Sequence, residues 1–340
     1  MVTWERFPDS AAHDWDQALL AADDHNVFQS HGWGEYKRRT GWLPERYLAK
    51  NASGSTMAMT QILTKAAPLG TTIGWAAGGP VLRFPGFAKS DVAGLAAALV
   101  KAVCDGHRKV FLRLQSHLPN HPDLAYGLSH VFAKPLARLN AGYTIHVDLA
   151  RSDDEIAKAM TSKHRYYIKQ SLAKDIRWVT EKSDQAIDDL VRLNNEVAKL
   201  KQVGWIATSR REVAGLCETL GENALIMNGY LGESVAASCL VLQFGKRAFY
   251  MIAASSKEGR DVSASYAMIS KLISILKTRG VTCFDFGGID PITPAARGVN
   301  HFKQGFGGQV VDYLGEWEWA TGRAQRWLGS LAIAVRRRAL

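Results

Sequence analysis

Long hydrophobic runs, paired cysteines and low-complexity segments are all missing from this 340-residue chain. No apolar run approaches the length of a membrane-spanning helix, which argues against an integral membrane protein of the helical class. The N-terminus, MVTWERFPDS, lacks the basic and then apolar order of a signal peptide. We therefore expect a cytoplasmic protein.

The cysteines lack the close spacing of a metal site or a redox pair, because no CxxC sequence occurs. The four are Cys104, Cys217, Cys239 and Cys283. We expect reduced thiols that are buried as small apolar side chains. The two histidines in HLPNH have a proline between them, which favours a loop over a metal-binding helix. The sequence has no P-loop either, and it predicts neither a metal nor a redox cofactor.

Basic residues outnumber acidic ones by 42 to 32, which gives a formal net charge of +10. Such a charge favours an anionic partner: nucleic acid, anionic lipid or a phosphorylated substrate. Lysines scattered over the surface give the same total, so only the position of the charges distinguishes these cases. With 47% hydrophobic residues, the chain has enough apolar side chains for two domain cores.

The order of predicted elements occurs twice along the chain: helices, an antiparallel meander, a helix and a strand. In the first half we predict helices at 10–22, 32–39 and 91–104 (the last capped by Asp91), and strands at 46–49, 57–65, 71–75, 109–116 and 143–149. In the second half we predict helices at 152–160, 164–173, 183–200, 209–220 and 263–278, and strands at 224–231, 234–244, 247–254 and 282–286. A last strand, 309–319, precedes a C-terminal helix.

This repetition predicts a mixed α/β (α+β) protein with two similar domains rather than one large doubly wound sheet. The first domain would comprise residues 1–149 together with a returning strand and helix at 315–340. The second would comprise residues 150–314. Because no long linker separates the halves, we expect tight contact and a cleft between them.

The stretch FDFGGIDPITPAARGVNHFKQGFGG, residues 284–308, has an unusual composition for a surface loop. Its glycines permit backbone conformations that are closed to other residues, and its prolines stiffen the excursion. Phe302 offers a stacking face and Lys303 a positive charge, just before the glycine cluster GFGG, which we expect to be flexible. A structural hairpin with glycine bulges is the alternative. The full combination favours a functional loop.

The C-terminal sequence GRAQRWLGSLAIAVRRRAL predicts a basic amphipathic helix. Its apolar face would carry Trp327, Leu328, Leu331 and Val335, with arginines on the polar side and at the end. Such a helix either packs on its own domain, with arginines favourable at the negative end of the helix dipole, or contacts a membrane surface. We expect packing, and keep peripheral contact with the inner face of the plasma membrane as the alternative.

The sequences FDFGGI and GVNHFKQGFGGQVVDYLGE resemble the signature of the FemABX aminoacyltransferases, which extend peptidoglycan interpeptide bridges from aminoacyl-tRNA. VFQSHGWGEYKRRTGW and SKHRYYIKQSLAKDIRW are similar to two further stretches of that family in the same order. The likeness spans residues 27–316. It implies two acetyltransferase-like (GNAT-like) domains, in the compact form without a coiled-coil arm. The oligomeric state is not implied.

The resemblance also implies roles for residues in the second half of the chain. Lys303 matches the Phe-Lys pair of the family and would stabilise the carbonyl oxyanion or the leaving ribose oxygen. Phe302 would stack on the terminal adenine of tRNA. Tyr250 falls on the strand where the family has a tyrosine, and its hydroxyl would bind the acceptor peptide or the departing oxygen. A core tyrosine with one satisfied hydrogen bond is an equal alternative.

The remaining implied residues are cations that would bind phosphate. Lys37 matches the family's lysine for the diphosphate of the acceptor, which is lipid II or a UDP-linked precursor. Arg210 and Arg211 are both candidates for an arginine that contacts the same group. Arg165 and Lys169 are spaced to share one helical face and would contact tRNA phosphates, unless they are simply exposed.

Two other functions remain open from the sequence. An acyl-CoA-dependent N-acyltransferase with the same fold would act on a polysaccharide or cell-surface precursor. Its pyrophosphate loop corresponds here to SSKEGRDVSAS, which has a single glycine and so departs from the usual glycine-rich pattern. A non-catalytic RNA-binding protein is the third possibility, although it leaves the glycine-rich stretch unexplained.

Overall fold

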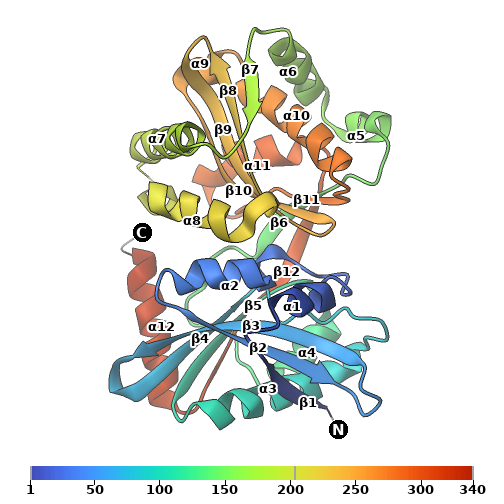
Figure 1. Ribbon diagram of the computed structural model, residues 1–340, viewed down its shortest axis with the longest axis vertical. Helices are drawn as coiled ribbons and strands as arrows, with labels where there is room; N and C mark the ends of the chain where they lie inside the picture. Colours follow the sequence, from blue (N-terminus) through green and yellow to red (C-terminus); the bar gives the residue numbers. More distant parts are fainter. Residues whose placement is uncertain (1, 203, 339–340) are drawn as a thin grey trace. The chain divides into compact units, whose positions relative to one another are not determined.

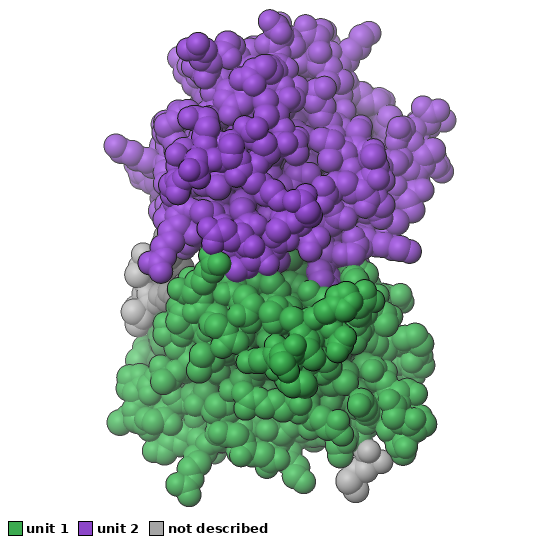
Figure 2. All heavy atoms as spheres, viewed as in Figure 1, with its two compact units in different colours: residues 1–142, 311–339 green, residues 143–310, 340 purple. Residues whose placement is uncertain are grey.

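The computed structural model describes residues 2–202 and 204–338. The chain divides into two compact units (Figure 2). Unit 1 comprises residues 1–142 together with 311–339, and unit 2 comprises residues 143–310. Both are mixed α/β, as the repeated order of elements predicts.

The sheet of unit 1 has the strand order β1-β2-β3-β4-β5-β12. Its strands are β1 (Thr3–Phe7), β2 (Leu43–Lys50), β3 (Thr56–Ala67), β4 (Thr71–Ala77), β5 (Val110–Pro119) and β12 (Gln309–Ala320). Neighbouring strands are antiparallel except β4 and β5, which are parallel and are connected through a helix. Strand β12 therefore returns from the end of the chain to complete the sheet that the N-terminal residues began (Figure 1).

The helices of unit 1 pack around this sheet (Figure 1). They are α1 (Ala12–Leu19), α2 (His31–Arg38), α3 (Val92–Gly106), α4 (Pro122–Ser129) and α12 (Arg323–Arg338). Residues Leu95, Leu99 and Val103 of α3 are buried in one apolar cluster with Leu112 and Leu114 of β5. Their spacing of four residues gives α3 the apolar stripe that this contact requires.

The sheet of unit 2 has the strand order β6-β11-β10-β9-β8-β7. Its strands are β6 (Tyr143–Asp148), β7 (Arg177–Thr180), β8 (Ala224–Leu231), β9 (Ser234–Phe244), β10 (Arg247–Ser255) and β11 (Cys283–Asp285). The meander β8-β9-β10 is antiparallel, and β11 runs parallel to β10. The sequence predicts this meander well, because glycines at both hairpin turns interrupt long apolar runs.

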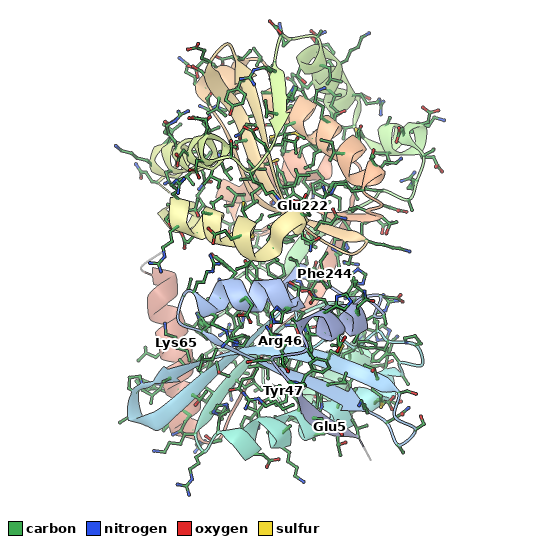
Figure 3. All side chains as sticks on the ribbon, viewed as in Figure 1. Glu5, Arg46, Tyr47, Lys65, Glu222 and Phe244 are labelled. Atoms are coloured by element: carbon green, nitrogen blue, oxygen red, sulfur yellow. The ribbon has the colours of Figure 1, made fainter. Side chains whose placement is uncertain are left out.

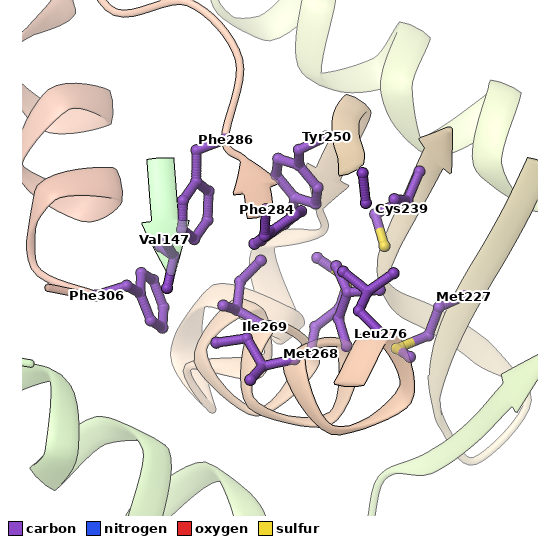
Figure 4. Close-up of a cluster of buried hydrophobic side chains, with 14 of the residues drawn as sticks. Val147, Met227, Cys239, Tyr250, Met268, Ile269, Leu276, Phe284, Phe286 and Phe306 are labelled. Atoms are coloured by element: carbon purple, nitrogen blue, oxygen red, sulfur yellow. The ribbon is translucent and has the colours of Figure 1, made fainter. Parts of the chain in front are cut away.

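The helices of unit 2 are α5 (Asp153–Ala159), α6 (Ser162–Leu172), α7 (Asp184–Leu200), α8 (Arg210–Leu220), α9 (Lys257–Asp261), α10 (Ala264–Thr278) and α11 (Arg297–Gln304). The core lies between α10 and the sheet, where Met268, Ile269 and Leu276 meet Phe284 and Phe286 (Figure 4). Strand β11 is paired with β10 and β6 in the sheet, and Phe284 anchors it in this core.

Strand β6 corrects one expectation from the sequence. It was expected to close the first domain at residue 149, but it pairs with β11 in the sheet of unit 2, with His146 opposite Asp285. Sequence periodicity identifies a strand but not its partner, so the first unit ends at residue 142 instead. Strand β1 and helix α4 were not predicted, and Asp91 provides no side-chain cap to α3 because a 3-10 turn precedes that helix.

Candidate functional site

Lys303 lies on a helix, whereas the prolines and glycines on either side of it suggest a loop. The turn Pro294–Ala296 leads directly into α11, with the proline at the start, where its missing N–H costs nothing. Lys303 is in the last turn of α11 and its side chain is half-buried. Its Nζ donates to the carbonyl of Gly288 at 2.8 Å and to that of Gly287 at 3.4 Å. The ammonium thus caps the turn that follows strand β11.

Asp285 holds the turn in place from the other side. Gly287 has a φ of +73°, a conformation that favours glycine, and its N–H donates to Asp285 Oδ1 at 2.7 Å. The same oxygen accepts a hydrogen bond from Thr144 of β6, and Oδ2 lies 3.4 Å from His146 Nε2. Neither Thr144 nor His146 was singled out from the sequence, since only the β6–β11 pairing brings them to this carboxylate.

The pKa values of the ionisable groups in this cluster are strongly shifted. Burial raises the pKa of Asp285, but hydrogen bonds and the charge of His146 outweigh it and lower the pKa to about 2. Burial also lowers the pKa of His146, yet its contacts with Asp285 and Cys283 raise it to about 9. At neutral pH the two form a charged pair. Burial lowers the pKa of Lys303 to about 8, with Asp285 acting in the opposite direction.

Phe302 belongs to an aromatic cluster on the surface of the unit 2 core. Its ring is half-buried, 5.2 Å from the ring centroid of Tyr266 and 5.1 Å from that of Phe306. His164, on α6, is 2.9 Å from the carbonyl of Phe302 through Nε2 and 2.8 Å from Thr161 Oγ1 through Nδ1. This histidine, rather than a flexible segment, fixes the end of α11 against α6.

Gly305 explains part of the glycine cluster. A Cβ at this position would lie 1.8 Å from Cε1 of His164, so only glycine allows the two elements to meet. The neighbouring Phe306 is fully buried. The stretch GFGG is therefore packed and not flexible, and Gly305 allows the close approach of the backbone to the His164 ring at the end of α11.

Tyr250 is a core residue of unit 2. It is 8% exposed, and its ring lies 5.9 Å from Phe284 and 5.8 Å from Phe286, both edge to face (Figure 4). Burial and the neighbouring Cys239 raise its pKa well above the usual value, so the hydroxyl stays protonated. These contacts favour the alternative of a core tyrosine over a chemical role.

The cysteines follow the expectation in part. Cys217 and Cys239 are buried, whereas Cys104 and Cys283 are half-buried, and all four are free thiols. Burial raises the pKa of Cys239 to about 12, which keeps that thiol protonated and unreactive.

Lys37 is in unit 1, in the last turn of α2. Its Nζ lies 4.8 Å from the ring centroid of Trp33 and 5.0 Å from that of Tyr36, which keeps the cation close to this helix. The helix is attached to the sheet by Arg46 of β2, whose side chain is 1% exposed and lies 3.1 Å from Glu35 (Figure 3). Lys37 is half-buried on a well-anchored helix.

The structure separates the two arginine candidates. Arg210 pairs with Asp184 at 2.5 Å and with Asp188 at 2.9 Å, so α7 already neutralises its charge. Arg211 is exposed and forms no ion pair within residues 2–202 and 204–338. Of the two, Arg211 is the cation that has charge to offer a ligand.

The basic helix α6 divides in a similar way. Arg165 donates to the carbonyls of Met160 and Ala157, the latter at 3.3 Å, and so closes the C-terminal end of α5. Lys169 is exposed and has no hydrogen-bond or ion-pair partner in the described part of the chain. Lys163 lies over the ring of Tyr167 at 5.8 Å and is exposed too. All three cations are exposed, but only the Arg165 guanidinium is held by hydrogen bonds to neighbouring carbonyls, so Lys163 and Lys169 are freer to contact a ligand.

The segment that would bind a CoA pyrophosphate is closed. Ser256 Oγ accepts from the N–H of Gly259 at 3.0 Å, and the Ser256 carbonyl accepts from that of Arg260 at 3.0 Å, forming the short helix α9. Hydrogen bonds from its own N–H and from Ser256 lower the pKa of Glu258, so a carboxylate stands at this helix start. A pyrophosphate there would meet negative charge instead of free N–H groups.

Residues 2–202 and 204–338 hold neither a candidate metal cluster nor a membrane-spanning helix. They contain no group of three or more His, Cys, Asp or Glu side chains suited to hold a metal ion. None of the helices within them is both long and apolar enough to cross a membrane.

Comparison with known proteins gives this geometry a context. A sequence model described as the FemAB family matches residues 170–328, which include α6 in part, the meander, Lys303 and β12. A crystal structure of FemX matches with a TM-score of 0.81 at 15% identity, over 96% of this chain and 99% of that one. Residues 170–328 of the chain thus resemble the FemAB family.

Other solved structures share the fold with this chain at low identity. A tandem GNAT protein from the clavulanic acid biosynthesis pathway matches with a TM-score of 0.55 at 12% identity, over 95% of this chain and 99% of that one. The structure of L-PGS from Bacillus licheniformis matches with a TM-score of 0.53 at 13% identity, over 94% and 96%. No curated protein sequence matches. The expected duplicated GNAT-like fold is confirmed, and the match to the FemAB family model supports an acyltransferase.

Proposed function

We propose that this protein transfers an amino acid from aminoacyl-tRNA to an amine of a peptidoglycan precursor, and so takes part in forming the interpeptide bridge of the cell wall. The observation that carries the proposal is Lys303, a half-buried ammonium on the last turn of α11, held by the carbonyls of Gly287 and Gly288. It lies within the segment that matches the FemAB family. The reaction takes place in the cytoplasm, where both substrates are made.

The chemistry needs no external oxidant or metal. The neutral amine of the acceptor attacks the ester carbonyl of the donor, so that a carbon–nitrogen bond forms and negative charge develops on the carbonyl oxygen. The bond to the ribose oxygen then breaks, and the proton lost by the amine ends on that oxygen. Lys303 stabilises the developing oxygen charge, a contribution of about 10²–10³ in rate for one such donor. The ester is already activated, so orientation supplies much of the remainder.

The other cations bind the substrates. Lys37 of unit 1 binds the diphosphate of the acceptor, lipid II or a UDP-linked precursor. Arg211 of unit 2 is the remaining candidate for a phosphate-binding arginine. Phe302 stacks on the terminal adenine, and Lys163 and Lys169 contact tRNA phosphates. Asp285 and His146 act through Lys303: together they fix the turn whose carbonyls hold it.

The acyl-CoA alternative is weaker for a specific reason. A pyrophosphate needs free backbone N–H groups, and in the SSKEGRDVSAS segment those of Gly259 and Arg260 are bonded to Ser256, while Glu258 adds a negative charge. The RNA-binding alternative does not explain why the half-buried ammonium of Lys303 is held by two carbonyls.

In the deciding experiment, the protein is incubated in parallel with labelled aminoacyl-tRNAs and with labelled acyl-CoAs, each with a panel of lipid-linked and UDP-linked precursors. The mass of the acceptor is then measured by mass spectrometry. We expect a mass gain of one aminoacyl residue that depends on intact aminoacyl-tRNA and is lost after ribonuclease treatment. A gain from acyl-CoA without any tRNA would replace the proposal with the alternative.

A further inference from the structure

We propose that helix α12 and the neighbouring segment 131–140 form a surface that binds anionic phospholipid membranes. Both belong to unit 1. This proposal does not depend on the transfer reaction, because it concerns a different face and a different ligand. We call the two segments together the basic apolar surface.

Helix α12 packs against the sheet of unit 1 along one side. A Cβ on Gly329 would lie 2.3 Å from Phe111 of β5, so the helix backbone is in close contact with the sheet. Ser330 Oγ donates to Glu318 at 3.1 Å, and Arg326 Nη2 donates to the carbonyl of Lys134 at 3.1 Å. The last contact joins α12 to the segment 131–140. Helix α12 therefore packs on its own domain, as expected, but only through this side.

The other side of α12 presents apolar side chains to solvent. Trp327 is 60% exposed and Leu331 is 42% exposed, and their spacing of one helical turn puts them on one face. On the segment joined to it, Leu136 is 71% exposed and Leu139 is 38% exposed. Val335, expected on the same face of α12, lies outside the residues whose side chains are described. Large apolar side chains gathered in this way mark an interaction surface.

The charge around these side chains has one sign. Residues 131–140 and 321–340 contain no Asp or Glu, although the whole chain has 32. In the part of the chain whose side chains are described, their basic residues are Lys134, Arg138, Arg323 and Arg326. The carboxylates that contact these segments, Glu316 and Glu318, are buried against Arg113 and do not offset the surface charge. Asp312, which acts on Lys134, is the exposed exception.

This combination fits a membrane surface better than other partners. Tryptophan at the interface, leucine in the acyl boundary and arginine at the headgroups are the arrangement of an interfacial helix. A second copy would bring one positive surface against another, which is unfavourable. Nucleic acid would use the arginines but leave the exposed leucines without a partner. Anionic lipid uses both.

The test is co-sedimentation of the full-length protein with phosphatidylcholine vesicles, with and without added phosphatidylglycerol. We expect binding that requires phosphatidylglycerol and weakens as salt is raised. The double variant Trp327→Ser/Leu331→Ser removes the exposed apolar pair and should bind at least about tenfold more weakly. The matched control Leu69→Ser/Leu200→Ser changes two leucines that are 71% and 67% exposed elsewhere and should bind like the wild type.

A second variant tests how much the positive charge contributes to vesicle binding. Arg138→Glu/Arg323→Glu keeps the apolar face and should lose about fivefold for each basic residue removed, with further loss from the added charge. Thermal unfolding of each variant shows whether it is folded. Equal binding of wild type to both kinds of vesicle, or full binding by both folded variants, overturns the proposal. So does a concentration-dependent dimer in light scattering that the serine pair abolishes, since a second copy would then be the partner.

Discussion

At the scale of single residues, the candidate site depends on one lysine and on the carboxylate behind it. Lys303 is held by two glycine carbonyls, and those carbonyls are oriented by Asp285 through the N–H of Gly287. His146 keeps Asp285 paired with an opposite charge. The three ionisable groups are therefore coupled. A change at Lys303 should appear mainly in kcat, and a change at Asp285 should appear in the free energy of unfolding.

Lys303→Met retains much of the side chain's length and removes the charge. If the ammonium stabilises the developing oxygen charge, kcat should fall about 10²–10³-fold. Lys303→Arg should restore only part, because a planar guanidinium places its charge differently. Steady-state kinetics with aminoacyl-tRNA give the measurement, and Lys271→Met on α10 is the control that should keep its rate. Near-normal turnover in Lys303→Met would assign the lysine to structure alone.

The pH profile of kcat should reveal the same ammonium. Because burial lowers the pKa of Lys303 to about 8, the charged form is lost as the pH rises through that value. We expect the wild-type rate to decline above about pH 8, after an initial rise as the acceptor amine loses its proton. The residual rate of Lys303→Met should lack the decline. A decline that persists in the variant would have to come from another group.

Asp285→Asn should change stability in a defined pH window. The pKa of Asp285 is lower in the folded protein, about 2, than in the unfolded chain. The stability that this shift contributes is fully present above the pKa of the unfolded chain and is lost as the pH falls through 2. The pKa of His146 is higher in the folded protein, about 9, than in the unfolded chain. The stability that this shift contributes is fully present below the pKa of the unfolded chain and is lost as the pH rises through 9. The deficit of the variant should therefore be greatest from about pH 4 to 6.5, at roughly 3 kcal/mol. Urea unfolding across this range measures it; a deficit independent of pH contradicts the pairing.

At the scale of elements, α11 is the structure that the sequence concealed. Prolines and glycines on both sides of it suggest a loop, yet Arg297–Gln304 is helical. Its end is fixed by His164 of α6 and by the close approach of Gly305. Strand β6 is a second example, since its partner, and with it the position of His146, was not readable from the local pattern.

Gly305→Ala tests how α11 is positioned. The new methyl would collide with the ring of His164, which has hydrogen-bond contacts at both nitrogens, so we expect a loss of about 1–3 kcal/mol in unfolding free energy and reduced kcat. Gly298→Ala, in the same helix with open space around it, is the matched control. It should be neutral or stabilise by up to about 1 kcal/mol. Equal effects of the two alanines would show that packing at Gly305 is not what fixes the helix.

At the scale of the whole molecule, the net charge of +10 is divided among surfaces with different tasks. Helix α6 presents Lys163 and Lys169, whereas the basic apolar surface belongs to unit 1. Arg165 and Arg210 contribute to the total but are engaged within unit 2. Total charge is therefore a poor guide to a partner until each cation is placed.

Binding of tRNA should weaken steeply with salt. Release of counterions gives a slope of about −0.9 in log K against log salt for each phosphate contact with a duplex, and about −0.7 with a single strand. Lys163→Glu/Lys169→Glu should lower the affinity and flatten the slope by about 2 units for a duplex contact. Lys199→Glu/Lys201→Glu, exposed charges at the end of α7, is the control and should leave the slope unchanged. Filter binding over a salt series gives both values. No affinity for RNA at low salt would count against an RNA donor.

The sequence by itself determined much of this protein: the duplicated mixed α/β order, the bounds of the meander β8–β10, and the importance of the stretch around Lys303. Those features depend on local periodicity, turn residues and motif spacing, which a linear chain displays directly. Only the tertiary structure decided that β6 pairs in unit 2, that Tyr250 is in the core, and that Arg211 rather than Arg210 is unpaired among the described residues. The physical reason is that burial and ion pairing depend on contacts between residues distant in sequence, and no local pattern specifies which of them meet.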